Sequence, residues 1–194
     1  MIKKHLGKKQ VWMVGACLLL AGGMLSAEPF DVQALDVGSV TTVPIGDYRE
    51  VSTVGFGINS QVHLGTAENA GLQAIGDFSA VYNVTTEAEA GLWDFAPAAG
   101  AAFYMPVGED WFVGGQGGYG LKVHLATGEW DSGVSGPKWY SDQFFYMAAE
   151  AGWTLEDFGT LYLRPRYELF IEEAAAGHVF KTDIGYRFSL GGND

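Results

Sequence analysis

Hydrophobic and polar residues alternate with a period of two along most of the chain after residue 27. Within residues 180–190 the even positions are mostly apolar or aromatic, whereas the odd positions include Lys181, Asp183 and Arg187. Residues 111–126 alternate in the same way. Successive side chains of a strand point to opposite faces, so this pattern predicts strands with one apolar and one polar face.

Eight segments show this alternation, and their regular spacing without a helical segment predicts an all-β fold. We expect an eight-stranded antiparallel up-and-down transmembrane β-barrel. The connections at 106–110 and 156–159 are tight, whereas the connection at 127–139 is long, a contrast typical of outer-membrane barrels. The expected strands span residues 30–43, 51–65, 71–84, 92–105, 111–126, 140–155, 160–171 and 179–190.

The direction of the apolar face decides between a soluble barrel and a membrane barrel. The interior of an eight-stranded barrel is just wide enough to be filled by side chains, so thirteen aromatic rings do not fit inside it. The opposite faces are rich in glycine, which suits a narrow lumen. We therefore expect the apolar faces to contact lipid; a periplasmic lipocalin-like carrier with those faces inward is the alternative. The thirteen rings belong to Phe56, Phe78, Tyr82, Phe95, Phe103, Trp111, Tyr119, Phe145, Trp153, Tyr167, Phe180, Tyr186 and Phe188.

The first 27 residues are typical of a secretory signal peptide. Four lysines precede an apolar run at 11–25, which Ser26 and Ala27 close. The run is shorter than the roughly 20 residues of a membrane-spanning helix. We expect residues 1–27 to be a signal peptide and residues 28–194 to form the outer-membrane barrel.

The composition is acidic, with 11 Lys and Arg against 23 Asp and Glu and a formal charge of -12. Without the four lysines of the leader, 7 cations face 23 anions, and 7 - 23 = -16. This charge argues against nucleic acid as a partner. The only cysteine, Cys17, lies in the leader, so the exported chain is not expected to form a disulfide.

Charged residues on the polar strand faces predict a balanced lumen with five charges of each sign. Unpaired charges in a narrow lumen would cost several kcal/mol each, so we expect an ion-pair ladder. Glu150 should face Arg164 or Arg166, and Glu168 should lie near Lys181 or Asp183. The ten residues are Lys122, Arg164, Arg166, Lys181, Arg187, Asp77, Asp94, Glu150, Glu168 and Asp183.

Eight of these residues form the candidate site, a lumen charge network that either fills the barrel or acts as a selectivity filter. They are Lys122, Glu150, Arg164, Arg166, Glu168, Lys181, Asp183 and Arg187.

No residues suggest catalysis, a cofactor or a metal site. The run at 115–120, GQGGYG, matches the dinucleotide fingerprint, but it lies inside an alternating strand and opens no helix. His63, His124 and His178 lack the Ser-Asn neighbours of a lipid A deacylase, and His63 and His124 lie near opposite ends of their strands. We expect hydrogen-bonded histidines in a protein that is not an enzyme.

The last strand resembles the insertion signal of small outer-membrane barrels typified by OmpW, OmpX and the membrane domain of OmpA. The signal residues are Asp183, Gly185, Phe188 and Leu190, although in that class the chain usually ends at the aromatic residue. The resemblance implies an outer-membrane location with both termini periplasmic. It also implies contact with outer-membrane lipid and insertion by the barrel-assembly machinery.

Two functions remain open. An OmpW-like barrel would be a narrow conduit for small apolar or neutral solutes, and Pro97 and Pro165 on the apolar face either create a side opening or are tolerated near bulges. The alternative is a closed structural or adhesive barrel whose extracellular loops bind a partner. The loop at 127–139, with Trp130 and Trp139, is the leading candidate for such binding.

Overall fold

A computed structural model of the chain describes residues 31–65, 71–87, 89–129, 137–155, 159–171 and 177–190. The expected signal peptide at 1–27 and Trp130 of the long loop lie outside the described residues.

None of the described residues belongs to a helix long and apolar enough to cross a membrane.

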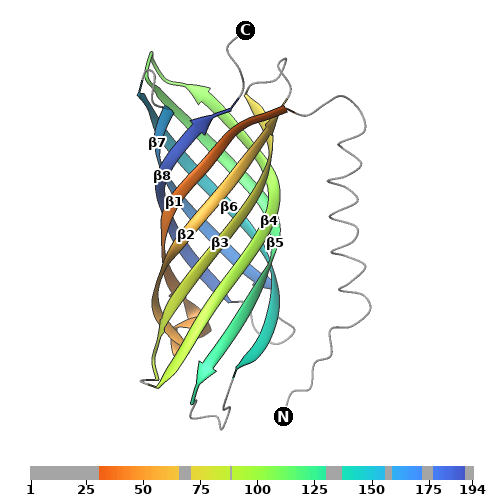
Figure 1. Cartoon of the computed structure of the whole chain (residues 1–194), viewed down its shortest axis with the longest axis vertical. Helices are drawn as coiled ribbons and strands as arrows, with labels where there is room; N and C mark the ends of the chain where they lie inside the picture. The colour runs from red at the N-terminus through yellow and green to blue at the C-terminus, as the bar shows by residue number, and fades with distance from the viewer. Residues whose placement is uncertain are drawn as a thin grey trace, which may run out of the picture. The chain divides into compact units, whose positions relative to one another are not determined.

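The described residues form a closed barrel of eight antiparallel strands (Figure 1). Each strand pairs with its neighbours in the sequence, and β8 closes the barrel by pairing with β1. The predicted up-and-down barrel is therefore confirmed. The strands are β1 Asp31–Ile45, β2 Ser52–Gly65, β3 Leu72–Thr85, β4 Ala90–Pro106, β5 Trp111–Gly128, β6 Lys138–Leu155, β7 Gly159–Ile171 and β8 His178–Ser189.

The strand boundaries follow the alternation pattern closely. All eight predicted strands are present, and their ends differ from the prediction by two residues at most. The pattern is weakest in β1, whose pairing with β8 runs from Ala34 opposite Ser189 to Ile45 opposite His178. The backbone pairing of β1 with β8 thus holds β1 in the barrel, although the alternation of its side chains predicts the strand only weakly.

The two ends of the barrel differ in their connections. We call the end where β1 begins and β8 ends the terminal end, and the other the loop end (Figure 1). At the terminal end the turn between β4 and β5 closes with a bond from the Val107 N–H to the Trp111 carbonyl (2.7 Å). Gly108 in this turn has a φ of 94°, a value that favours glycine. At the loop end a short 3-10 helix, η1 Gly46–Glu50, joins β1 to β2.

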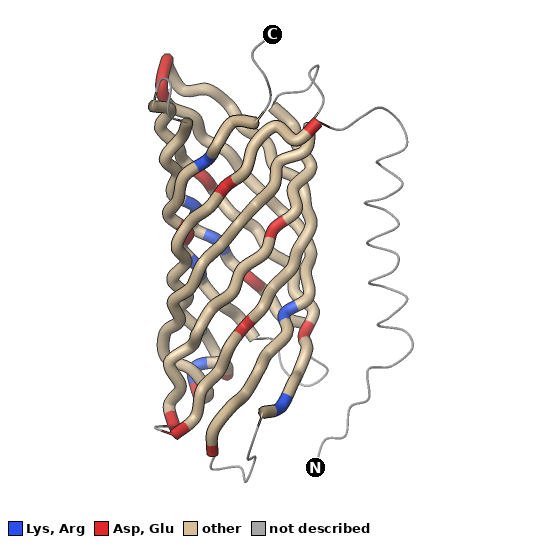
Figure 2. The backbone as a smooth tube through the Cα atoms, viewed as in Figure 1, with Lys and Arg blue, Asp and Glu red and all other residues tan. Residues whose placement is uncertain are grey.

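The apolar faces of the strands point outward and the charged faces point into the lumen. Phe56 and Trp111 are 56% and 55% exposed, whereas Arg164 and Glu168 are fully buried. Charged residues lie along the strands between the two ends (Figure 2). The predicted direction is confirmed, and the lipocalin-like alternative with an apolar interior is wrong because the interior holds the charges.

Glycines of the inward faces make room for aromatic rings inside the lumen. A Cβ atom on Gly118 would lie 2.6 Å from Cε1 of Tyr146, and one on Gly152 would lie 2.2 Å from Cε1 of Phe112. Gly118 and Gly152 therefore leave the space that the rings of Tyr146 and Phe112 occupy in the narrow lumen. The rings that enter the lumen from the strands belong to Tyr104, Phe112, Phe144, Tyr146, Tyr162 and Phe170.

The two outward prolines leave the strand register unchanged. On either side of Pro97, Phe95 lies opposite Val123 and Ala98 lies opposite Gly120, which is one continuous register. The pairing of β6 and β7 likewise resumes in register beyond Pro165. Among the described residues, therefore, neither proline shifts the register, but the backbone pairing is interrupted at both. Ala96 and Pro97 have no partner on β5, and Arg164 and Pro165 have none on β6.

Aromatic side chains on the outer face gather toward both ends of the barrel. At the terminal end Trp111 and Trp153 stack with ring centroids 5.9 Å apart. At the loop end Trp93 contacts Tyr82 and Phe95, with centroid distances of 5.1 and 6.4 Å. Two aromatic girdles that flank an apolar band are typical of barrels in a bilayer.

Candidate functional site

Near the terminal end, two arginines share two carboxylates. Nε of Arg164 donates to Glu150 at 2.7 Å, and Nη2 of Arg164 donates to Asp36. Arg187 donates through Nε to Asp36 at 2.7 Å and through Nη2 to Glu150 at 2.7 Å. Each charge is thus compensated where bulk water cannot screen it.

Aromatic rings enclose both guanidinium groups. The Cζ atom of Arg187 lies 4.8 Å from the ring centroid of Tyr104 and 5.3 Å from that of Phe112. The Cζ atom of Arg164 lies 4.4 Å from the ring centroid of Tyr162. Cation–π attraction at these distances adds to the ion pairs and holds each guanidinium in one orientation.

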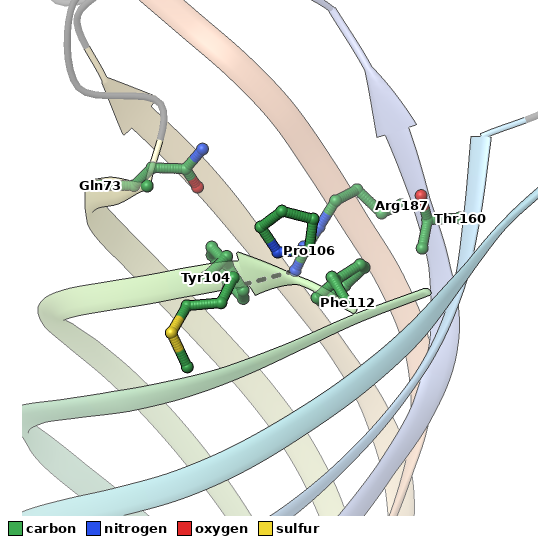
Figure 3. A pocket seen from close by; sticks show the side chains of 8 residues that line it. Gln73, Tyr104, Pro106, Phe112, Thr160 and Arg187 are labelled. Carbon is green, nitrogen blue, oxygen red and sulfur yellow. Dashed lines mark hydrogen bonds between the residues drawn. The ribbon is translucent and has the colours of Figure 1, made fainter. Parts of the chain in front are cut away.

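A cavity of about 360 Å³ opens at the terminal end beside this group (Figure 3). Arg187 lines the cavity and donates to the Tyr104 hydroxyl at 3.3 Å. The carboxylates that bind Arg187 are fully buried, so the cavity ends at the ion pairs. The lining residues labelled in Figure 3 are Gln73, Tyr104, Pro106, Phe112, Thr160 and Arg187.

In the middle of the lumen, one carboxylate holds three cations. Glu168 accepts from Nζ of Lys122 and contacts Nζ of Lys181, each at 2.8 Å. Its third contact is Nε of Arg166, at 3.1 Å. Nη1 of Arg166 also donates to Asp77. The group links strands β3, β5, β7 and β8 across the lumen.

At the loop end, a histidine bridges two carboxylates. Nδ1 of His124 lies 2.7 Å from Asp94, and Nε2 lies 3.2 Å from Asp142. An imidazole donates from both nitrogens only when it is protonated, so this geometry fits the charged form. His124 therefore acts as a further cation of the lumen.

Tyr48 of η1 inserts into this loop-end group. Its hydroxyl donates to Asp94 at 3.1 Å, and its ring stacks on Phe170 with centroids 6.0 Å apart. Burial, and then the Asp94 carboxylate, raise the pKa of the Tyr48 phenol well above its usual value. The phenol is therefore a stable hydrogen-bond donor that closes the loop-end mouth over Phe170 and Asp94.

Most of the sequence-predicted lumen residues meet one another in the structure. Glu150 contacts Arg164, and Glu168 contacts Lys181, each the first of the two partners expected for it. Asp183 does not pair with Glu168; its nearest cation is Nη1 of Arg164, at 3.8 Å.

The expected balance of five charges of each sign in the lumen is wrong. Asp36 and Asp142 also contact lumen cations, so among the described residues seven carboxylates face five Lys and Arg side chains. His124 supplies part of the missing positive charge, and Nε2 of His63 lies 3.0 Å from Asp36. Asp36 was missed because β1 alternates weakly, although its place between the outward Leu35 and Val37 was a usable signal.

The residues of the expected insertion signal lie on both faces of β8. Asp183 and Gly185 face the lumen, where the Tyr162 hydroxyl lies over Gly185. Phe188 is exposed on the outer face. Leu190 follows β8, and its N–H donates to the Gln33 carbonyl at 2.9 Å.

The fold and the lumen together define a class: a small closed antiparallel barrel with an apolar outer wall and an interior filled by ion pairs. Within the described residues, no group of three or more His, Cys, Asp and Glu side chains could hold a metal ion. No protein-family model and no curated protein sequence matches the chain.

Several solved structures are similar to this chain in fold. Neisserial surface protein A is 10% identical with a TM-score of 0.62, over 84% of this chain and 100% of that one. Ail, the attachment invasion locus protein of Yersinia pestis, solved with the heparin analogue sucrose octasulfate, is 16% identical with a TM-score of 0.54, over 80% and 97%. The N-terminal β-barrel domain of Pseudomonas aeruginosa OprF is 5% identical with a TM-score of 0.50, over 81% and 98%. At these identities the likeness shows the fold alone.

Proposed function

We propose that the protein is an integral outer-membrane barrel, exported by its leader and inserted with both termini in the periplasm. The outward apolar wall and its two aromatic girdles support contact with lipid. The alternating face of β8, with Phe188 outward and Gly185 inward, suits recognition by the barrel-assembly machinery. Cell fractionation tests the location: recovery in the soluble periplasmic fraction would contradict it.

We further propose that the barrel is closed and that it serves to hold its loops at the cell surface. One observation carries this proposal: seven of the charged residues that would line a pore are buried at 0 to 1% exposure, namely Asp36, Lys122, Arg164, Arg166, Glu168, Lys181 and Asp183. A side chain along an open water path would keep exposed surface. Ion pairs thus cross the lumen near the terminal end, in the middle and at the loop end.

The opposing hypothesis is the narrow conduit for small apolar or neutral solutes. The cavity at the terminal end, walled by Tyr104 and Phe112, is the feature that favours it. A conduit would require Arg164, Arg187 and their carboxylates to move apart, which removes compensation from buried charges.

Charge narrows the choice of partner at the loops. The loop-end connections at 46–51, 86–89, 129–137 and 172–177 contain eight Asp and Glu residues and one Arg, so 1 - 8 = -7. A polyanion such as the heparin analogue bound by Ail would be repelled by these loops. We therefore propose that a loop partner of this chain is neutral or cationic.

Planar-bilayer recordings and liposome swelling test closure directly. The reconstituted barrel should give no current steps and no swelling in small neutral solutes. A paired removal of charges, Arg187→Met with Glu150→Gln, should raise permeability, whereas Arg49→Met in exposed η1 should not. Steady current or solute entry through the unaltered protein would refute closure and support the conduit.

Loop binding is tested separately. Deletion of residues 130–136 should abolish binding of a cationic or neutral surface partner while the bilayer stays tight. Binding that survives this deletion would place the partner elsewhere on the protein.

A further inference from the structure

Several buried polar atoms in the middle of the lumen have no hydrogen-bond partner among the protein's own atoms. They lie on β2 on one side and mostly on β7 and β8 on the other. The set comprises Oδ1 of Asn59, both amide atoms of Gln61, the hydroxyls of Tyr146 and Tyr162, Nη1 of Arg164, Nη2 of Arg166 and both carboxylate oxygens of Asp183.

Contacts between neighbouring side chains connect these residues into one central layer. Gln61 lies opposite Asp77 in the β2–β3 register, and Asp77 binds both Nδ2 of Asn59, at 2.7 Å, and Nη1 of Arg166. Arg166 in turn lies over the ring of Tyr146, with Cζ 3.9 Å from the centroid.

On the far side of the layer, Arg164 joins the two remaining residues. Its Nη1 lies 3.8 Å from Oδ2 of Asp183, and its Cζ lies 4.4 Å from the ring centroid of Tyr162. A separation of 3.8 Å is too long for a direct hydrogen bond, so neither atom satisfies the other.

Buried polar groups in folded proteins are almost always paired with protein or with ordered water. The same lumen contains an amide nitrogen that is paired with protein: Nε2 of Gln116 donates to Glu150 at 2.7 Å and to the Tyr104 hydroxyl at 2.9 Å. Gln61 is also buried, but neither its amide nitrogen nor its amide oxygen has a hydrogen-bond partner in the protein. The contrast indicates that Gln61 and its neighbours bind something other than protein.

The mixture of donors and acceptors identifies the occupant. Gln61 Nε2, Arg164 Nη1 and Arg166 Nη2 are donors, whereas Asn59 Oδ1, Gln61 Oε1 and the Asp183 oxygens are acceptors. An anion would face the Asp183 carboxylate, and a cation would face two guanidinium groups. Water donates and accepts, so it alone suits both sets.

We propose that the centre of the lumen is a binding site for a cluster of ordered water molecules, held between Asn59 and Gln61 of β2 and Arg164, Arg166 and Asp183 of β7 and β8. The barrel is then closed by a hydrated polar network rather than by dry packing. Closure and hydration can be tested separately, because Asn59 and Gln61 take no part in the ion pairs of Arg187 at the terminal end or of His124 at the loop end.

Water-selective NOE spectra of the intact protein in micelles test the site. The Gln61 side-chain amide should show a cross-peak to long-lived water, and the paired Gln116 amide should show none. Absence of the Gln61 cross-peak would overturn the proposal. Anomalous density for bromide or rubidium in crystals grown with those ions, at the centre of the layer, would overturn the choice of water.

A matched pair of substitutions gives an independent readout. If water bridges the layer, Gln61→Leu displaces it and lowers the urea midpoint of unfolding, as Gln116→Leu does by breaking direct bonds. If Gln61 is simply unpaired, Gln61→Leu removes an unsatisfied amide and raises the midpoint, which would contradict the proposal. Bilayer conductance should stay unchanged in either variant, so this test and the test of closure fail separately.

Discussion

Glu168→Gln tests how far the central ion pairs stabilise the barrel. The fully buried Glu168 contacts all three cations of the central group, Lys122, Lys181 and Arg166. The substitution keeps the size and shape of the side chain and removes its charge. The experiment therefore isolates charge compensation from packing.

The expected loss follows from what each cation retains. Arg166 keeps Asp77, and Lys122 keeps Asp94 at 4.0 Å. Within the described part of the chain, Lys181 has no second carboxylate contact and keeps the hydroxyl of Ser79, at 3.0 Å. Removing one partner of a buried ion pair costs about 3–5 kcal/mol, so we expect that loss in the free energy of unfolding, centred on Lys181.

Urea unfolding in lipid vesicles, followed by tryptophan fluorescence, measures the change. A second variant, Glu168→Gln with Lys181→Met, removes the stranded ammonium and should recover at least half of the loss. Glu50→Gln changes an exposed carboxylate of η1 and should shift the free energy by no more than about 0.5 kcal/mol.

Two results would refute the reasoning. A loss of less than about 1 kcal/mol for Glu168→Gln would mean that water screens the centre of the lumen as it screens a surface pair. A double variant no more stable than the single variant would mean that the cost does not arise at Lys181.

Three further predictions address the loop end and the glycines. Because the pKa of the folded Tyr48 phenol is raised, the phenol should stay neutral below its usual pKa near 10.0, and its stabilising contact with Asp94 should be lost only as pH rises above that value. Ultraviolet phenolate titration, compared with Tyr48→Phe, should show no ionisation of Tyr48 near pH 10. Ionisation there would contradict the burial of Tyr48. His124→Leu removes the donor that Asp94 and Asp142 share and leaves Asp94 with the Tyr48 hydroxyl. It should lower the free energy of unfolding by about 1–3 kcal/mol in the same urea assay, whereas an unchanged value would exclude the charged bridge. Gly118→Ala places a Cβ atom 2.3 Å from a backbone oxygen and 2.6 Å from the Tyr146 ring, and it should lower the free energy of unfolding by at least about 1–3 kcal/mol. Gly76→Ala, whose Cβ atom meets nothing within 4 Å, should leave it unchanged. Equal effects would refute the inference that inward glycines make room for the rings.

The candidate site was predictable to the extent that strand faces are predictable. Side chains alternate regardless of what surrounds them, so Arg164, Glu150 and Lys181 could be assigned to the lumen from the sequence. Asp36 could not be assigned with the same ease, because polar residues occur on both faces of β1, including the exposed Ser39 and Thr41. Pairing with β8 determines its orientation.

The histidines show a second limit. From the sequence they have no neighbours that suggest a role, since their partners lie on other strands. His63 of β2 reaches Asp36 of β1, and His124 of β5 reaches Asp94 of β4 and Asp142 of β6. Such pairs depend on the stagger between strands, which alternation alone does not determine.

The sequence by itself determined the number of strands, their ends and the face that each turns outward, because these features follow from a period of two and from the volume of the aromatic rings. Only the tertiary structure decided which charge meets which and whether the lumen is filled. Those properties depend on barrel closure and strand stagger, which bring Asp36 of β1 to Arg164 of β7 and place Tyr48 of η1 over Phe170. A local pattern contains no information on distances across the barrel, and the function proposed here rests on those distances.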